Sequence, residues 1–198
     1  MIRDEGVADE GTPMREQASI QPTGSDSPPS DRLIIAGRGI ALLAAWTATG
    51  GSLYFSEVFG WLPCVLCWYQ RIAMYPLAFI LTVALIRGDR SVHWYVLPLS
   101  ITGGAIALYH YLLIRTDWFV PPPCTGGIPC NVDYINLLGF INIPFLALIA
   151  FTIVSFGVLA PAVMLDDEPA PPPLRHDPLR LTALALAGAI IVAFAVVR

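Results

Sequence analysis

Residues 64–86 read CVLCWYQRIAMYPLAFILTVALI, a pair of cysteines followed by a long apolar run. Between residues 68 and 86 the run holds one charged residue, Arg71. A helix of about 20 such residues spans the hydrocarbon core of a bilayer. Pro76 is compatible with a membrane helix, because neighbouring groups can satisfy the carbonyl that it leaves unbonded. The stretch therefore predicts a transmembrane helix with two cysteines at its N-terminal end.

Four similar apolar runs accompany this one, and none shows the alternation of a barrel strand. The five runs cover residues 33–55, 68–86, 95–114, 137–160 and 181–197. Pro98 and Pro144, like Pro76, are expected inside their helices as tolerated kinks. The sequence thus predicts an all-α membrane protein with five transmembrane helices.

The composition excludes other classes of protein. Of the 198 residues 56% are hydrophobic and only 13% charged, whereas soluble domains carry about 25% charged residues. All 11 basic residues are arginine and the net charge is -4, so a nucleic-acid partner has no electrostatic support. We expect an acidic disordered tail at 1–32, a membrane core at 33–165, a Pro-rich linker at 166–179 and the extra helix at 180–198.

The positions of arginine predict the orientation, because short cytoplasmic loops of membrane proteins are enriched in basic residues. Six arginines fall on one side of the five predicted helices. They are Arg32, Arg38, Arg87, Arg90, Arg175 and Arg180. We therefore expect a cytoplasmic N-terminus and extracytoplasmic cysteine loops.

The first cysteine pair, Cys64 and Cys67, lies where the second helix is expected to begin. Exposed backbone N–H groups at a helix N-terminus favour a thiolate over a thiol. At about 100° per residue, Cys64, Cys67 and Arg71 share one stripe of the helix. An arginine inside a membrane helix is costly and by default functional, so we expect it to face the Cys67 thiolate or an oxygen of a quinone. The alternative is that Arg71 only extends to the lipid headgroups.

The second pair, Cys124 and Cys130, lies in a loop rich in proline and glycine. A disulfide closing so short a loop stabilises the fold by only about 2 kcal/mol, and an exposed, tight disulfide is typically labile. Exchange between the pairs through a transient Cys67–Cys124 link is compatible with the sequence. A zinc site of four thiolates is the competing use of the cysteines, although an oxidising compartment favours disulfides.

Residues 60–72, GWLPCVLCWYQRI, together with residues 107–111, ALYHY, and the second cysteine pair, resemble the disulfide bond formation protein B family. The likeness covers roughly residues 33–160. It implies a four-helix transmembrane bundle, with the fifth, C-terminal transmembrane helix outside the family core. The activity that it implies is that of an enzyme of the bacterial plasma membrane that reoxidises an extracytoplasmic thioredoxin-fold thiol oxidase. The electrons would pass to a membrane quinone, ubiquinone or menaquinone.

The resemblance also implies roles for individual residues. Cys64 and Cys67 would be the pair beside the quinone, and Arg71 would belong to the quinone site. Cys124 and Cys130 would exchange with the partner oxidase, Cys124 forming the mixed disulfide. His110 would belong to the quinone pocket, unless it merely sits at the headgroup boundary. No metal is expected.

One residue departs from the pattern of the family, and the residues themselves leave two alternative functions open. Gln70 stands where some members carry a carboxylate, and no consequence is drawn from it. Two other functions remain open from the residues themselves. One is a non-catalytic membrane protein with structural disulfides or a four-cysteine metal site, and the other is a reductase of quinone epoxides.

Overall fold

The computed structural model describes residues 29–119, 128–164 and 178–196, and within them it contains five long α-helices. They are α1 (Pro29–Glu57), α2 (Val65–Arg87), α3 (His93–Arg115), α4 (Ile143–Met164) and α5 (Pro178–Val196). A short 3-10 helix, η1 (Arg90–Val92), connects α2 to α3. All five are long and apolar enough to cross a membrane. The predicted all-α membrane architecture, including the fifth helix, is confirmed.

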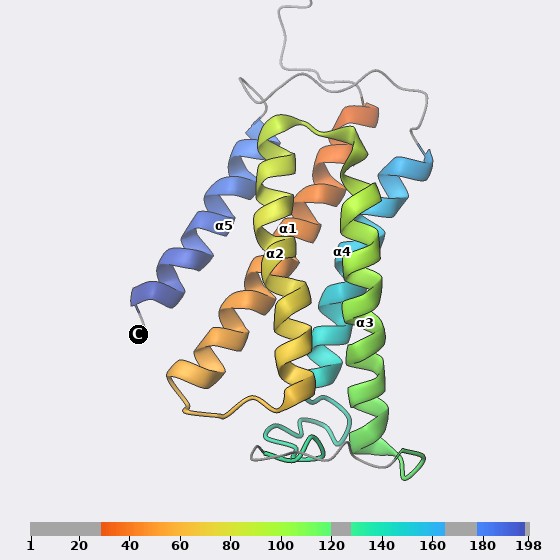
Figure 1. Cartoon of the computed structure of the whole chain (residues 1–198). Coiled ribbons are helices and arrows are strands. Elements are labelled where there is room, and N and C mark those ends of the chain that lie inside the picture. Colours follow the sequence, from red (N-terminus) through yellow and green to blue (C-terminus); the bar gives the residue numbers. More distant parts are fainter. Residues whose placement is uncertain (1–28, 120–127, 165–177, 197–198) are drawn as a thin grey trace, which may run out of the picture.

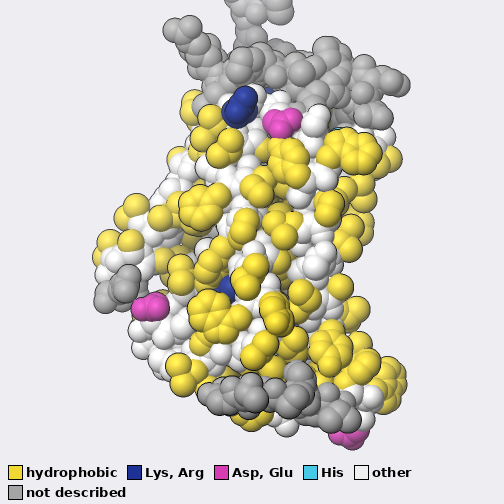
Figure 2. All heavy atoms as spheres, in the orientation of Figure 1, with side chains coloured by type: hydrophobic (Ala, Val, Ile, Leu, Met, Phe, Trp, Pro, Cys, Tyr) yellow, Lys and Arg dark blue, Asp and Glu magenta, His cyan; other side chains and the backbone are white. Residues whose placement is uncertain are grey.

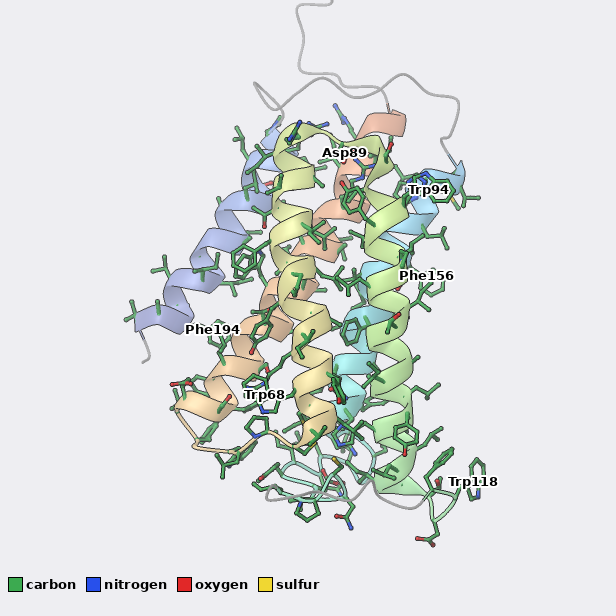
Figure 3. All side chains as sticks on the ribbon, in the orientation of Figure 1. Trp68, Asp89, Trp94, Trp118, Phe156 and Phe194 are labelled. Atoms are coloured by element: carbon green, nitrogen blue, oxygen red, sulfur yellow. The ribbon has the colours of Figure 1, made fainter. Side chains whose placement is uncertain are left out.

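Helices α1 to α4 form a bundle, and α5 packs on its side against α1 (Figure 1). In Figure 1, α5 runs away from the bundle toward its C-terminal end. Apolar side chains cover most of the visible body between the two ends of the molecule, as expected of a surface that faces lipid chains (Figure 2). Phe156 of α4, labelled in Figure 3, is one of these outward-facing side chains.

The two ends of the bundle differ in what they carry. One end, here named the cysteine end, holds the beginning of α2 and the loop that includes Cys130. Asp89 and Trp118 mark the opposite end and the cysteine end, respectively (Figure 3). Residues 1–28, most of the predicted linker and Cys124 lie outside the described residues.

Small residues allow a close contact of the backbones of α1 and α4. A Cβ atom added to Gly37 would lie 2.8 Å from the carbonyl oxygen of Gly157, and one added to Gly157 would lie 2.6 Å from the oxygen of Gly37. Glycine lets two membrane helices approach until their backbones touch. This contact brings α4 close to α1 along the side of the bundle that forms the cavity described below.

The start of α4 differs from the prediction. The helix begins at Ile143 rather than at residue 137, because Leu138 has a φ of 56° in a turn and Asn142 accepts a hydrogen bond from the Phe145 N–H at 3.1 Å. Pro144 therefore lies in the first turn, where its missing N–H costs nothing. The predicted internal position of Pro144 is wrong, and Pro161 is the proline inside α4.

The other two predicted internal prolines are confirmed, and so is the start of α2. Pro76 lies inside α2 and Pro98 inside α3. Cys64 is the N-cap of α2, with φ -70° and ψ 172°. The helix ends at Gly88, whose φ of 67° is a left-handed conformation that glycine adopts without strain. The cysteine pair is thus fixed at the first turn of a membrane helix.

Candidate active site

The two sulfurs of the first pair lie side by side at the N-terminus of α2. Their Sγ atoms are 3.2 Å apart, and the backbone N–H of Cys67 donates to Cys64 Sγ at 3.4 Å. Both are thiols in this structure. The hydrogen bond with the Cys67 side chain and then burial raise the pKa of the Cys64 thiol to about 12. A proton shared by the pair therefore stays on Cys64, which leaves the Cys67 sulfur as the nucleophile.

Arg71 is held against α1 by two hydrogen bonds. Its Nη2 donates to the carbonyl of Ser52 at 3.0 Å and to Ser56 Oγ at 2.7 Å. Its guanidinium also lies over the ring of Trp68, 5.4 Å from the centroid. Arginine has five N–H donors, and within the described residues those on Nε and Nη1 have no protein acceptor. These donors are available to a ligand.

A cavity of about 610 Å³ opens between α1, α2 and α4, in the size range of ligand sites. Cys67, Gln70 and Arg71 border it near the cysteine end. Most of the remaining lining is apolar and follows α1 from Phe55 back to Ile40, about 22 Å at the rise of an α-helix. The cavity therefore suits a long ligand with a polar head beside Cys67 and an apolar tail.

His110 lies inside the protein, on the side of α3 that faces α2. Its side chain is 2% exposed and is therefore enclosed by protein. Its Nε2 is 3.0 Å from the carbonyl oxygen of Cys130 and 3.7 Å from Cys64 Sγ. Its Nδ1 is 3.0 Å from Nε2 of Gln70. His110 thus contacts both cysteine pairs and α2.

The described cysteine of the second pair packs against the first pair. Cys130 is 1% exposed and belongs to one apolar cluster with Cys64, Leu66 and Leu113. The loop that carries it is fastened to the loop between α1 and α2, because the Tyr134 hydroxyl donates to the Leu62 carbonyl at 3.2 Å. The fold therefore brings residues of both extramembrane loops together over the start of α2.

One group of described residues has the composition of a metal site. Cys64 Sγ, Cys67 Sγ and a ring nitrogen of His110 lie within 4.8 Å of one another. Zinc would need a lone pair on that nitrogen. Nε2 faces the Cys130 carbonyl at 3.0 Å, and a carbonyl only accepts, so Nε2 carries a proton there. The geometry makes His110 a hydrogen-bond donor rather than a ligand.

The structure brings Cys64, Cys67, His110 and Cys130 together. Cys67 and Arg71 border the cavity, and His110, predicted for the same pocket, does not line it. Sequence reasoning missed four residues that hold them. They are Gln70, Ser52, Ser56 and Tyr134. For Gln70 a signal existed, since a polar side chain next to Arg71 in an apolar membrane helix needs a partner inside the protein.

Comparison with known proteins agrees with this geometry. Residues 36–197 match the family model described as "Disulfide bond formation protein DsbB", a match that runs through α5. The "Disulfide bond formation protein C" of Bacillus subtilis (strain 168) is 51% identical over 122 residues, 59% of this chain and 88% of that protein. The "Probable disulfide formation protein C 1" of Bacillus anthracis is 46% identical over 120 residues, 58% of this chain and 86% of that protein.

A third organism carries a similar protein. The "Probable disulfide formation protein" of Coxiella burnetii (strain CbuK_Q154) is 40% identical over 130 residues, 65% of this chain and 88% of that protein. No solved structure matches the chain significantly. The family match covers four of every five residues and includes both cysteine pairs with Arg71 and His110. The chain is therefore a member of the disulfide bond formation protein DsbB family, a multi-pass membrane protein with the role of a disulfide oxidoreductase.

Proposed function

We propose that this protein reoxidises an extracytoplasmic thioredoxin-fold thiol oxidase and passes the two electrons to a membrane quinone, ubiquinone or menaquinone. The observation that carries this proposal is the position of the first pair. Cys67 borders the long cavity, while Cys64 packs against Cys130 of the second pair. A redox pair so placed can receive electrons from an outer loop and deliver them to a ligand in the membrane.

The electron path consists of two thiol–disulfide exchanges and one oxidation. A thiolate of the partner attacks Cys124 of the Cys124–Cys130 disulfide, forms a mixed disulfide with Cys124 and releases Cys130 as a thiolate. The second thiolate of the partner then attacks the mixed disulfide, which forms the partner's own disulfide and releases Cys124. The new dithiol of the second pair then reduces the Cys64–Cys67 disulfide in the same way. Each exchange moves two electrons and conserves the number of disulfides. Finally, the first pair loses two electrons and two protons and becomes a disulfide again.

Residues of this chain can hold a quinone in the cavity. The Nε and Nη1 donors of Arg71 suit a quinone oxygen, and the apolar walls along α1 and α4 suit a long hydrocarbon tail. A bound quinone would supply the acceptor for two electrons and two protons. Because Cys64 retains its proton, Cys67 is the sulfur that would transfer electrons to a quinone in the cavity.

We further propose that the cysteine end faces the extracytoplasmic side of a bacterial plasma membrane. Arg32, Arg87 and Arg180 lie at or near the helix ends opposite the cysteine end. Such a distribution is typical of the cytoplasmic side. An oxidising compartment would keep the second pair available as a disulfide.

The central test is stoichiometric turnover by the purified protein in detergent without oxygen. A reduced thioredoxin-fold oxidase and a quinone are supplied, and quinol absorbance and partner thiols are both followed. We expect one quinol for each partner disulfide formed, and no turnover with Cys67→Ser. Quinol formation by Cys67→Ser at the wild-type rate would refute the electron path.

The cavity is tested by a matched pair of glycine substitutions. Gly51 of α1 borders the cavity and Gly188 of α5 does not, and an added Cβ meets nothing within 4 Å at either position. Gly51→Leu should fill part of the cavity and raise the KM for quinone by about tenfold, which corresponds to a modest overpacking penalty. Gly188→Leu should leave KM unchanged. Equal KM values for the two variants would place the quinone elsewhere.

A further inference from the structure

Gln70 is a buried polar side chain for which the electron path above has no use. It lies three residues after Cys67 on α2, is 6% exposed, and its Nε2 is 3.0 Å from Nδ1 of His110 on α3. A buried amide in an apolar helix is costly unless its hydrogen bonds are satisfied. Its partner, His110, is in turn the residue that contacts both cysteine pairs.

The hydrogen-bond partners of His110 fix the position of its ring proton. The carbonyl of Cys130, 3.0 Å from Nε2, can only accept, so Nε2 carries the hydrogen. In a neutral ring Nδ1 is then an acceptor, and the amide of Gln70 has to donate to it. The opposite tautomer would set the lone pair of Nε2 against the lone pairs of the carbonyl oxygen. The geometry is thus consistent with one neutral form, the Nε2–H tautomer.

Resting on the function proposed above, we propose that Gln70 is a positioning residue for electron transfer between the two cysteine pairs. Its amide holds His110 as the Nε2–H donor, and His110 holds the main chain of Cys130 against the first pair. The two side chains and the Cys130 carbonyl form a continuous chain of hydrogen bonds from α2 through α3 to the outer loop.

The position of Cys64 gives this chain a chemical consequence. Cys64 Sγ lies 3.7 Å from the same Nε2 that donates to Cys130. A protonated Nε2 can donate to a sulfur that carries negative charge during exchange, but it cannot remove a proton from a thiol. His110 therefore stabilises negative charge on the Cys64 sulfur by donating a hydrogen bond from Nε2. Gln70 keeps His110 in the Nε2–H form that can donate.

Glutamine, glutamate and leucine differ in the hydrogen bonds that they can form with Nδ1 of His110. A carboxylate in its place only accepts, so it would require a proton on Nδ1 in addition to the one on Nε2. Gln70→Glu should therefore convert His110 to an imidazolium with both nitrogens protonated. Gln70→Leu keeps a similar volume but removes the donor to Nδ1, so only the Cys130 carbonyl still favours the Nε2–H tautomer and the ring is held on one side only.

The first experiment reads the ring directly and needs no quinone or partner. The full chain, labelled with ¹⁵N in its histidine rings, is studied in micelles, and His110→Asn identifies the signals of His110. We expect a protonated Nε2 and an unprotonated Nδ1 in the wild type, and two protonated nitrogens in Gln70→Glu. A wild-type proton on Nδ1 alone would overturn the proposal, whatever the electron acceptor is.

The second experiment measures exchange between the pairs, again without quinone. Reduced partner is mixed with the oxidised protein, samples are quenched with acid and alkylated, and mass spectrometry follows the appearance of thiols at Cys64 and Cys67. Gln70→Leu should slow this step by about tenfold, the upper range for loss of one hydrogen bond. His110→Asn should slow it at least as much.

Ser100→Ala is the matched control. Ser100 is also buried on α3, and it shares a hydrogen bond of 2.9 Å with Ser155 away from the cysteines. Loss of the Ser100 hydroxyl should leave the rate of thiol–disulfide exchange between the two cysteine pairs unchanged. Equal slowing in Ser100→Ala and Gln70→Leu would overturn the proposal in favour of a merely structural role. An unchanged exchange rate in Gln70→Leu with a raised KM for quinone would also overturn it, since Gln70 would then serve the cavity that it borders.

Discussion

At the scale of single residues, the two sulfurs of the first pair are chemically unequal although they are 3.2 Å apart. The Cys64 pKa is raised from 9.0 to about 12, so at pH 9 only about one Cys64 side chain in a thousand is a thiolate. Because the shift is upward, the reactive form appears only as the pH rises toward 12. We predict that iodoacetamide modifies Cys67 well before Cys64 between pH 7 and 9.

Mass spectrometry of the reduced protein checks this order, in a background of Cys124→Ser and Cys130→Ser. Cys64 labelling should rise with pH up to about 12, whereas labelling limited by access alone would not follow pH in this way. In denaturant the two cysteines should react alike. Equal labelling of both at pH 8 in the folded protein would contradict the assignment of the proton to Cys64.

The residues that carry chemistry were partly visible in the sequence. An arginine is rare in a membrane helix, and two cysteines separated by two residues at a helix start are a typical redox pair, so Cys64, Cys67 and Arg71 could be singled out by type and spacing. The partners of Gln70 could not, because they depend on how α2 packs on α3. The hydrogen bond joins residues that are 40 positions apart, and no local pattern encodes that distance.

At the scale of helices, the contact of α1 with α4 depends on two glycines. A Cβ at Gly157 would lie 2.6 Å from the backbone oxygen of Gly37, and backbone cannot move aside as a side chain can. We predict that Gly157→Val separates the helices and lowers the free energy of unfolding by about 2–3 kcal/mol. Thermal unfolding in detergent measures this loss.

Gly188→Val is the control for that prediction, because an added Cβ there meets nothing within 4 Å. It should leave the melting temperature close to that of the wild type. If both valine variants melted alike, the close contact of α1 and α4 would not contribute to stability.

Hydropathy predicts the presence of the long helices well but does not predict where α4 begins. The length of the apolar runs predicted the five long α-helices of the described residues, since a helix satisfies the hydrogen bonds of its own backbone in lipid. It misplaced the start of α4, because Leu137 and Leu138 are as apolar as the helix that follows. The turn there is set by the φ of 56° at Leu138 and by Asn142, which hydropathy does not record.

At the scale of the whole molecule, the site and the fifth helix are separate. The cavity beside Cys67 is bordered by α1, α2, α4 and the extramembrane loops, and no described residue of α5 lines it. Helix α5 instead buries Arg180, Ala183 and Ala187, largely against α1. A bundle of four helices thus suffices to build the site, and α5 covers one side of it.

This separation predicts that loosening α5 affects stability but not chemistry. A Cβ added to Gly39 of α1 would lie 3.3 Å from the Cβ of Ala183, so this interface has no room for a larger side chain. Ala183→Phe should lower the free energy of unfolding by about 1–3 kcal/mol through overpacking, while kcat and the KM for quinone stay at wild-type values. Leu186→Phe, on the exposed side of α5, should change neither. A raised KM in Ala183→Phe alone would mean that α5 shapes the cavity through α1, and the four-helix account of the site would have to be given up.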